Sequence, residues 1–183
     1  AKCGGDRLRT ALEDLLDFEQ VSGGTLSLNL TETNIIEILG EALLKSQPVM
    51  DQHKVSARMI LQESEIPWQC DPALLDRALR HLLSNAAKFS PDNSEVCVIV
   101  TRDFRQLNIR VKDSGPGIPD NLHEKIFQPF WQQDLSDTRD KQGIGLGLTI
   151  SRQAIRRMGG ELSIEPCDGA GAEFLITLPA RPL

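Results

Sequence analysis

The chain has 183 residues, of which 40% are apolar and 25% are charged. This length and composition are typical of one globular domain of ordinary size and argue against an intrinsically disordered chain. The net charge of −6 disfavours nucleic acid or an anionic membrane surface as a partner, because both require a basic surface. No apolar run is long enough to cross a membrane, and no signal-peptide pattern is present.

The first half of the chain predicts two helices, each followed by a strand. In chain order these are a helix over 7–21, a strand over 26–30, a helix over 33–53 and a strand over 55–62. Gly23 and Gly24 end the first helix, and Thr33 is the predicted N-cap of the second. Pro48 lies inside that second helix, so we expect a kink or a break there.

The second half predicts a helix, a hairpin, a short helix, another helix and a final strand pair. These elements cover 72–89, 96–101 with 107–112, 119–127, 145–158, and 161–165 with 173–178, with a polar loop over 132–142. Asp71 is the predicted cap of the helix at 72–89, with Pro72 at its first position. Hairpins without regular βαβ alternation predict an α+β fold, a two-layer sandwich of a mixed sheet packed on helices.

Polar residues line one face of the helix at 72–89. Arg77, His81, Asn85 and Lys88 follow at spacings of four, four and three residues, so they are neighbours on that face. Such a line is either a solvated face or the wall of a polar site. Asn85 is unusual because Asn is a poor residue for a helix interior. Its amide oxygen suits Mg²⁺, and Lys88 could meet a phosphate group as a point charge.

Two glycine-rich segments are the other candidates for a binding site. The sequence over 113–119, DSGPGIP, directly follows a predicted strand. Its acid could accept a hydrogen bond from an exocyclic amine such as that of adenine, although an ordinary turn is the simpler interpretation. The sequence over 143–148, GIGLGL, opens a helix, where unpaired N–H groups bind anions. It matches neither a P-loop nor the dinucleotide fingerprint, and a flexible hinge is the competing interpretation.

The order of these segments resembles the catalytic and ATP-binding domain of sensor histidine kinases, in the wider ATPase group that includes gyrase, Hsp90 and MutL. HLLSNAAKFS over 81–90 resembles the N box, and DSGPGIP resembles the first glycine box. IFQPFWQ over 126–132 resembles the F box, and GIGLGL resembles the second glycine box. The F box distinguishes histidine kinases from the other ATPases of this group. The resemblance therefore implies the Bergerat fold and ATP with Mg²⁺ as cofactors.

The resemblance also implies roles for individual residues. Asn85 should hold a Mg²⁺ ion that bridges the triphosphate, Lys88 should contact phosphate, and Asp113 should receive the adenine amino group. Arg139 or Lys141, in an ATP lid over 131–144, could neutralise charge on the γ-phosphate. The other residues that the resemblance places at the nucleotide are Phe89, Gly115, Gly117, Ile118, Phe127, Phe130, Gly143, Gly145, Leu146, Gly147 and Leu148.

Two positions depart from the family pattern. His81 stands where the family often has a second Asn, four residues before Asn85, and is either a site residue whose charge depends on pH or a structural residue. Ala172 stands where the family commonly has Thr, so one hydroxyl is lost. Both departures leave open whether catalysis is at full strength.

The N-terminal helix resembles the end of the second dimerisation helix of the family. We therefore expect residues 1–24 to be a helical remnant and residues 25–183 to be the catalytic domain of a longer, homodimeric, membrane-anchored sensor. None of the three histidines, His53, His81 and His123, has the context of a phosphoacceptor. The four cysteines, Cys3, Cys70, Cys97 and Cys167, have no metal or redox spacing, which favours free thiols in the cytoplasm.

The predicted function is transfer of the ATP γ-phosphate to a histidine outside this chain. The expected partners are the dimerisation and phosphoacceptor helices of the parent kinase and the receiver domain of a response regulator, with no direct membrane contact. Two alternatives stay open at this point. One is an ATPase of the gyrase, Hsp90 or MutL type that drives conformational change, and the other is a non-catalytic module that binds a partner kinase.

Overall fold

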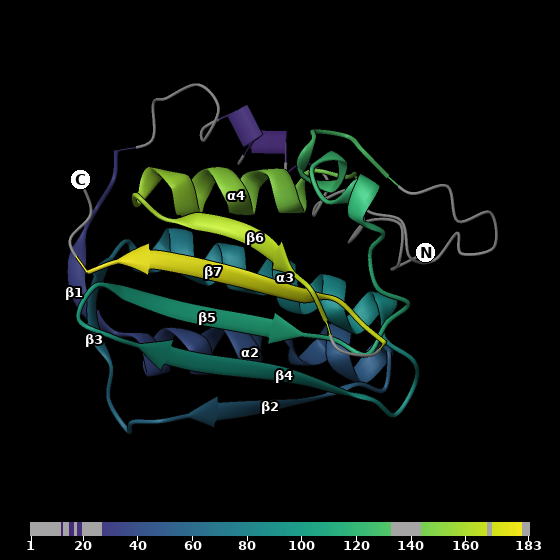
Figure 1. Cartoon of the computed structure of the whole chain (residues 1–183), viewed down its shortest axis with the longest axis horizontal. Coiled ribbons are helices and arrows are strands. Elements are labelled where there is room, and N and C mark those ends of the chain that lie inside the picture. The colour runs from purple at the N-terminus through teal and green to yellow at the C-terminus, as the bar shows by residue number, and fades with distance from the viewer. Residues whose placement is uncertain are drawn as a thin grey trace.

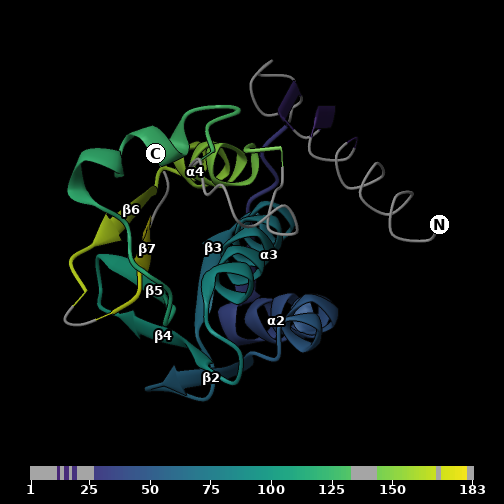
Figure 2. The same cartoon turned by 90° about the vertical axis from the view of Figure 1, so that its right-hand side faces the viewer.

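The domain has two layers, a mixed five-stranded sheet and a layer of helices that covers one of its faces (Figures 1 and 2). The computed structural model describes residues 27–132, 144–167 and 170–180, together with Leu12, Leu15, Leu16, Phe18 and Glu19. The predicted α+β sandwich is therefore confirmed.

The main sheet has the strand order β2-β4-β5-β7-β6. Its strands are β2 (Ser56–Leu61), β4 (Glu95–Arg102), β5 (Gln106–Lys112), β6 (Glu161–Glu165) and β7 (Glu173–Pro179). Strands β2 and β4 pair in parallel, and every other pair is antiparallel. The predicted hairpin β4–β5 and the predicted pair β6–β7 are both present.

Period-two patterning determines which face of the sheet meets the helices. In β4, Val96, Val98 and Val100 are buried, whereas the residues between them are partly exposed. The same alternation in β5 and β7 places one apolar row from each strand in the core. This buried face packs against the apolar sides of the helices in one continuous core.

Three helices form the second layer: α2 (Ile35–Gln52), α3 (Pro72–Phe89) and α4 (Gly147–Arg157). Helix α3 lies between the other two (Figure 2). Its predicted cap is confirmed, because Asp71 Oδ1 accepts hydrogen bonds from the N–H groups of Ala73 and Leu74, both at 3.1 Å. The second carboxylate oxygen accepts from Asn29 N–H at 2.9 Å, so Asp71 also fixes the segment that precedes β1.

The structure corrects the sequence prediction around the first strand. Residues 27–30 are not a strand; β1 (Thr31–Asn34) follows them instead and pairs with β3 (Pro67–Cys70), which the sequence did not predict. The cap of α2 is Asn34 rather than Thr33. The Asn34 side-chain oxygen accepts from Ile36 N–H at 3.2 Å and from Ile66 N–H at 3.1 Å, so it closes the helix and ties it to the approach to β3.

Other boundaries differ in detail. Helix α2 continues through Pro48, so of the predicted kink or break the break does not occur. The helix predicted over 119–127 is two short 3₁₀ turns, η1 (Asp120–Leu122) and η2 (Lys125–Phe127). Leu12, Leu15, Leu16, Phe18 and Glu19 are helical as predicted, and the rest of the helix at 7–21 lies outside the described residues. Most of the predicted loop over 132–142 lies outside them too.

No helix within the described ranges is long and apolar enough to span a membrane. The three described cysteines, Cys70, Cys97 and Cys167, are free thiols as predicted. Cys3 lies outside the described residues.

Candidate functional site

Asp113 directly follows β5 and is only 6% exposed. Its Oδ1 accepts hydrogen bonds from the backbone N–H groups of Gly115 at 2.8 Å and Ala172 at 3.0 Å. Its own N–H donates to the Ala172 carbonyl at 2.9 Å. Burial raises the pKa of the Asp113 carboxyl, and the two backbone donors oppose that rise. The carboxylate is therefore held in one orientation at the junction of β5 and β7.

The first glycine box lies against the end of α3. A Cβ atom at Gly115 would come within 2.9 Å of the Phe89 carbonyl oxygen and 3.0 Å of Asp113 Oδ1. Only glycine allows this approach without a shift of the backbone. Ser114 N–H also donates to Ser90 Oγ at 3.3 Å. The N box and the first glycine box are thus in direct contact.

The polar face of α3 meets the start of α4. Arg77, His81, Asn85 and Lys88 are all partly buried, so this face is not simply solvated. A Cβ atom at Gly147 would lie 3.0 Å from His81 Nδ1, which places the second glycine box directly against the N box. Burial, reinforced by the cationic side chains of Arg80, Arg77 and Lys88, lowers the pKa of His81 to about 4. His81 is therefore neutral near pH 7.

A backbone hydrogen bond connects the F box to the second glycine box. Phe130 N–H donates to the Gly145 carbonyl at 3.0 Å. Gly145 has a φ of +77°, and a Cβ atom there would lie 2.7 Å from the Trp131 carbonyl oxygen. Glycine is required at this position both by its conformation and by the close approach of the F box.

The aromatic rings of the F box have different environments. Phe127 is buried and belongs to the core, whereas Phe130 is 58% exposed. The Phe130 ring contacts Phe18 of the N-terminal segment edge-on, with ring centroids 6.1 Å apart. Phe18 also packs on the small apolar cluster of Leu146 and Ile150.

The structure brings seven of the predicted site residues into contact with one another or with their neighbours in the four boxes. His81, Phe89, Asp113, Gly115, Phe130, Gly145 and Gly147 take part in the contacts described above. Ile118 and Leu148 pack on the core, and Leu146 is fully buried, so these three support the site through packing. Gly117 has a φ of +78° and lies against the Gly171 carbonyl. Arg139, Lys141 and Gly143 lie outside the described residues.

Sequence reasoning missed several residues that support this site. Ala172 holds Asp113 through its backbone N–H and carbonyl groups, a contact that its side chain does not indicate. Thr149 and Arg152 of α4 both contact Phe127. No local pattern indicates those contacts, because they depend on the packing of α4 beside η2.

Asn85 is the residue of this site that could hold the Mg²⁺ ion that the sequence leads us to expect. Among the described residues, no group of three or more His, Cys, Asp or Glu could hold a metal ion. Asn85 would share a Mg²⁺ ion with phosphate oxygens, a donor set that Mg²⁺ accepts. A cavity of about 350 Å³ between α2 and α3 has charged walls, but neither Asn85 nor Asp113 lines it. The contacts among the four boxes, not that cavity, define the site.

A mixed sheet covered by helices, with an Asn-bearing helix, a buried Asp and a glycine-rich helix start at one end, defines an ATP-binding domain of the kinase and ATPase class. The family described as histidine kinase-, DNA gyrase B-, and HSP90-like ATPase matches residues 70–182, and the chain belongs to this family. It is an ATP-binding catalytic domain of the sensor histidine kinase type, a phosphotransferase domain, as the sequence predicts.

Known relatives agree with this assignment. The chain is 32% identical over 178 residues to the sensor protein GacS of Pseudomonas syringae pv. syringae, covering 94% of this chain and 20% of GacS. It is 36% identical over 172 residues to the sensor protein KdpD of Rathayibacter rathayi, covering 94% of this chain and 19% of KdpD. The chain therefore spans about a fifth of the length of these curated relatives.

Solved structures show the same fold. Full-length ShkA in complex with AMPPNP matches with a TM-score of 0.83 at 26% identity, over 98% of this chain and 38% of ShkA. The catalytic domain of the histidine kinase ThkA matches with a TM-score of 0.73 at 25% identity, over 84% of this chain and 97% of that domain. ThkA in complex with the response regulator TrrA matches with a TM-score of 0.78 at 23% identity, over 99% of this chain and 49% of that chain.

Proposed function

We propose that this chain binds ATP with Mg²⁺ and transfers the γ-phosphate to a histidine outside this chain. The observation that carries the proposal is the convergence of the four boxes. Residues that are far apart in sequence meet through the pairs Phe89–Gly115, His81–Gly147 and Phe130–Gly145. Positioning and charge neutralisation are the main requirements of phosphoryl transfer, and this convergence supplies positioning.

Asp113 is the proposed hydrogen-bond acceptor for adenine. Both of the hydrogen bonds to its carboxylate described above go to Oδ1, which supports Oδ2 as the acceptor for the adenine amino group. Phe89, at the end of α3, is 37% exposed and is proposed to lie near the nucleotide. Gly115 and Gly117 shape the turn beside them.

The phosphates are proposed to lie between α3 and the start of α4. The N–H groups near Gly145 and Gly147 are at a helix N-terminus, which attracts anions. Asn85 would hold Mg²⁺ and Lys88 would contact phosphate, while Arg139 or Lys141 stays the predicted cation at the γ-phosphate. Bound Mg²⁺ would neutralise charge on the phosphate oxygens.

The transfer exchanges one phosphorus bond for another. The bond from the γ-phosphorus to the β–γ bridging oxygen breaks, a bond to an imidazole nitrogen of the acceptor forms, and ADP leaves. Neutral His81 lies against Gly147 and is proposed to shape the phosphate site without adding charge.

The proposed context is a cytoplasmic kinase portion of a homodimeric sensor. Its partners would be the dimerisation and phosphoacceptor helices of the parent kinase and the receiver domain of a response regulator. The structure of ThkA in complex with the response regulator TrrA supports the last of these partners. The domain boundary at residues 24 and 25 stays a prediction.

Transfer from labelled ATP to an added acceptor-helix domain tests the proposal. We expect Mg²⁺-dependent labelling by this chain, its loss in Asn85→Ala, and normal labelling in Asn108→Ala. Asn108 is a matched control because it lies in β5 and its side chain accepts a hydrogen bond from Thr177. Unchanged transfer by Asn85→Ala would show that the metal assignment is wrong. ATP hydrolysis without any transfer would favour the ATPase alternative, and absence of ATP binding would favour the non-catalytic module.

A further inference from the structure

Arg152 lies in the middle of α4 and connects this helix to two other elements. Its Nε donates to Glu161 Oε1 of β6 at 2.9 Å. Its Nη1 and Nη2 donate to the two carboxylate oxygens of Glu124, between η1 and η2, at 2.9 and 3.3 Å. The side chain is only 15% exposed. A paired, partly buried Arg of this kind has a fixed geometry, because the two-pronged contact restricts its rotation.

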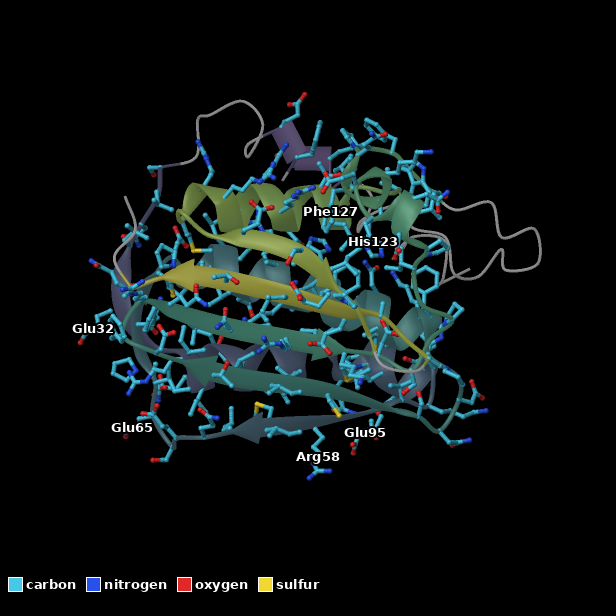
Figure 3. All side chains as sticks on the ribbon, in the orientation of Figure 1. Glu32, Arg58, Glu65, Glu95, His123 and Phe127 are labelled. Carbon is cyan, nitrogen blue, oxygen red and sulfur yellow. The ribbon has the colours of Figure 1, made fainter. Side chains whose placement is uncertain are left out.

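The same side chain covers the ring of Phe127. The Arg152 guanidinium carbon lies 4.5 Å from the centroid of that ring, a distance at which a cation is attracted to the aromatic face. Figure 3 labels Phe127 beside α4. The Arg152 side chain therefore contacts both the ring of Phe127 and the carboxylate of Glu124, three residues before it.

Thr149 adds a second contact from the same face of α4. It precedes Arg152 by three residues, the spacing of neighbours on a helix. Thr149 Oγ1 donates to the Phe127 carbonyl at 2.9 Å, and both residues are buried. Helix α4 thus fixes the backbone of Phe127 through Thr149 and its ring through Arg152.

These contacts connect Phe127 back to the start of α4. From Phe127 the chain runs three residues to Phe130, whose N–H donates to the Gly145 carbonyl. Gly145 in turn leads directly into α4. The N-terminal end of α4 is therefore held from both sides, by its own continuation and by the F box.

We propose that Arg152 and Thr149 are positioning residues for phosphate binding, an inference that rests on the proposed function. They would act through Phe127 and Phe130, which hold the N–H groups near Gly145 and Gly147 where the phosphates bind. Fixing these donors before binding removes an ordering cost that would otherwise reduce affinity. Neither residue needs to touch the nucleotide.

Arg156 provides a matched control. It lies one helical turn beyond Arg152 and donates two hydrogen bonds to the same Glu161 carboxylate, both at 3.0 Å. Arg156→Ala therefore removes an arginine from α4 and a pair with Glu161, but leaves the contacts of Arg152 with Phe127 and Glu124 in place.

The test measures the affinities of adenosine and a non-hydrolysable ATP analogue for the same folded chain. The quantity to compare is the affinity for the ATP analogue divided by the affinity for adenosine. Asp113 contributes to the binding of both ligands, whereas the start of α4 contributes only to the binding of the analogue. We expect Arg152→Ala to lower this ratio about tenfold, the effect of losing roughly one good interaction. Arg156→Ala should change it by less than about twofold, and Arg152→Lys should restore part of the loss because it keeps a cation.

A second pair of variants tests the hydroxyl. Thr149→Val keeps the shape and removes the donor to the Phe127 carbonyl, whereas Thr149→Ser keeps the donor. We expect the affinity ratio to fall in Thr149→Val and to be largely kept in Thr149→Ser. Equal ratios in Arg152→Ala and Arg156→Ala would overturn the positioning role while nucleotide binding itself persists. Failure of the unchanged chain to bind any adenine nucleotide would instead overturn the proposed function.

Discussion

Asp113 shows how much one side chain does in this domain. Its Oδ1 joins the first glycine box to the start of β7 by accepting from Gly115 and Ala172. Its position next to β5 was evident from the sequence, because an acid directly after a strand and before a glycine-rich turn is a recognisable pattern. The contact with Ala172 was not evident, because Ala172 is 59 residues away and contributes only its backbone.

Replacement of Asp113 by Asn should change base preference more than stability. The Asn oxygen can still accept from Gly115 and Ala172, so we expect the fold to persist. Its amide NH₂ would face the adenine amino group, donor against donor, and adenine nucleotide affinity should fall about tenfold or more. Calorimetry with adenine and guanine nucleotides checks this, since guanine presents an acceptor at that position. An unchanged affinity for the adenine nucleotide would show that Asp113 does not recognise the base.

His81 should make the folded chain sensitive to acid. Burial, with the Arg80, Arg77 and Lys88 charges, lowers its pKa to about 4 from 6.5. The unfolded chain therefore binds more protons than the folded chain between these values, and the free energy of unfolding should fall as pH drops through this window. Denaturant unfolding at pH 7 and pH 4.5 should show a smaller decrease in His81→Gln than in the unchanged chain. Equal decreases would show that His81 is charged in the folded state.

At the scale of elements, caps and periodicity predicted α3 well. Asp71, Pro72 and an apolar stripe are local signals, and the helix begins and ends where they indicate. Strands β1 and β3 were misplaced or missed because each has only four residues and pairs with the other. Asn34 was overlooked as a cap because its second acceptor contact, to Ile66, comes from 32 residues away. Such elements are defined by tertiary pairing rather than by local sequence.

Gly145 connects the F box to the start of α4, and replacing it should weaken this contact. Gly145→Ala places a Cβ atom 2.7 Å from the Trp131 carbonyl oxygen at a φ of +77°. We expect a loss of about 2 kcal/mol in the free energy of unfolding and weaker nucleotide binding. Gly40→Ala in α2 is the control, because its new Cβ would have no atom within 4 Å apart from the neighbouring backbone of its own helix. This substitution should stabilise the chain by about 0.5–1 kcal/mol. Chemical denaturation measures both, and the reverse order of stabilities would contradict the structure.

For the molecule as a whole, the sequence predicted the class of domain but not the contacts that support the candidate site. The four boxes and their order indicated a histidine kinase catalytic domain, and the family match confirms it. Arg152 and Thr149 could not be predicted as partners of Phe127, because no local spacing connects them. They contact it only because α4 packs beside η2.

Binding of ATP with Mg²⁺ is tested most directly by a calorimetric titration of the chain with a non-hydrolysable ATP analogue, with and without Mg²⁺. We expect saturable one-to-one binding that Mg²⁺ strengthens. The corresponding GTP analogue should bind more weakly, because the Asp113 carboxylate accepts from an amino group that guanine lacks at that position. Absence of saturable binding at millimolar nucleotide, or equal binding of both analogues, would contradict it.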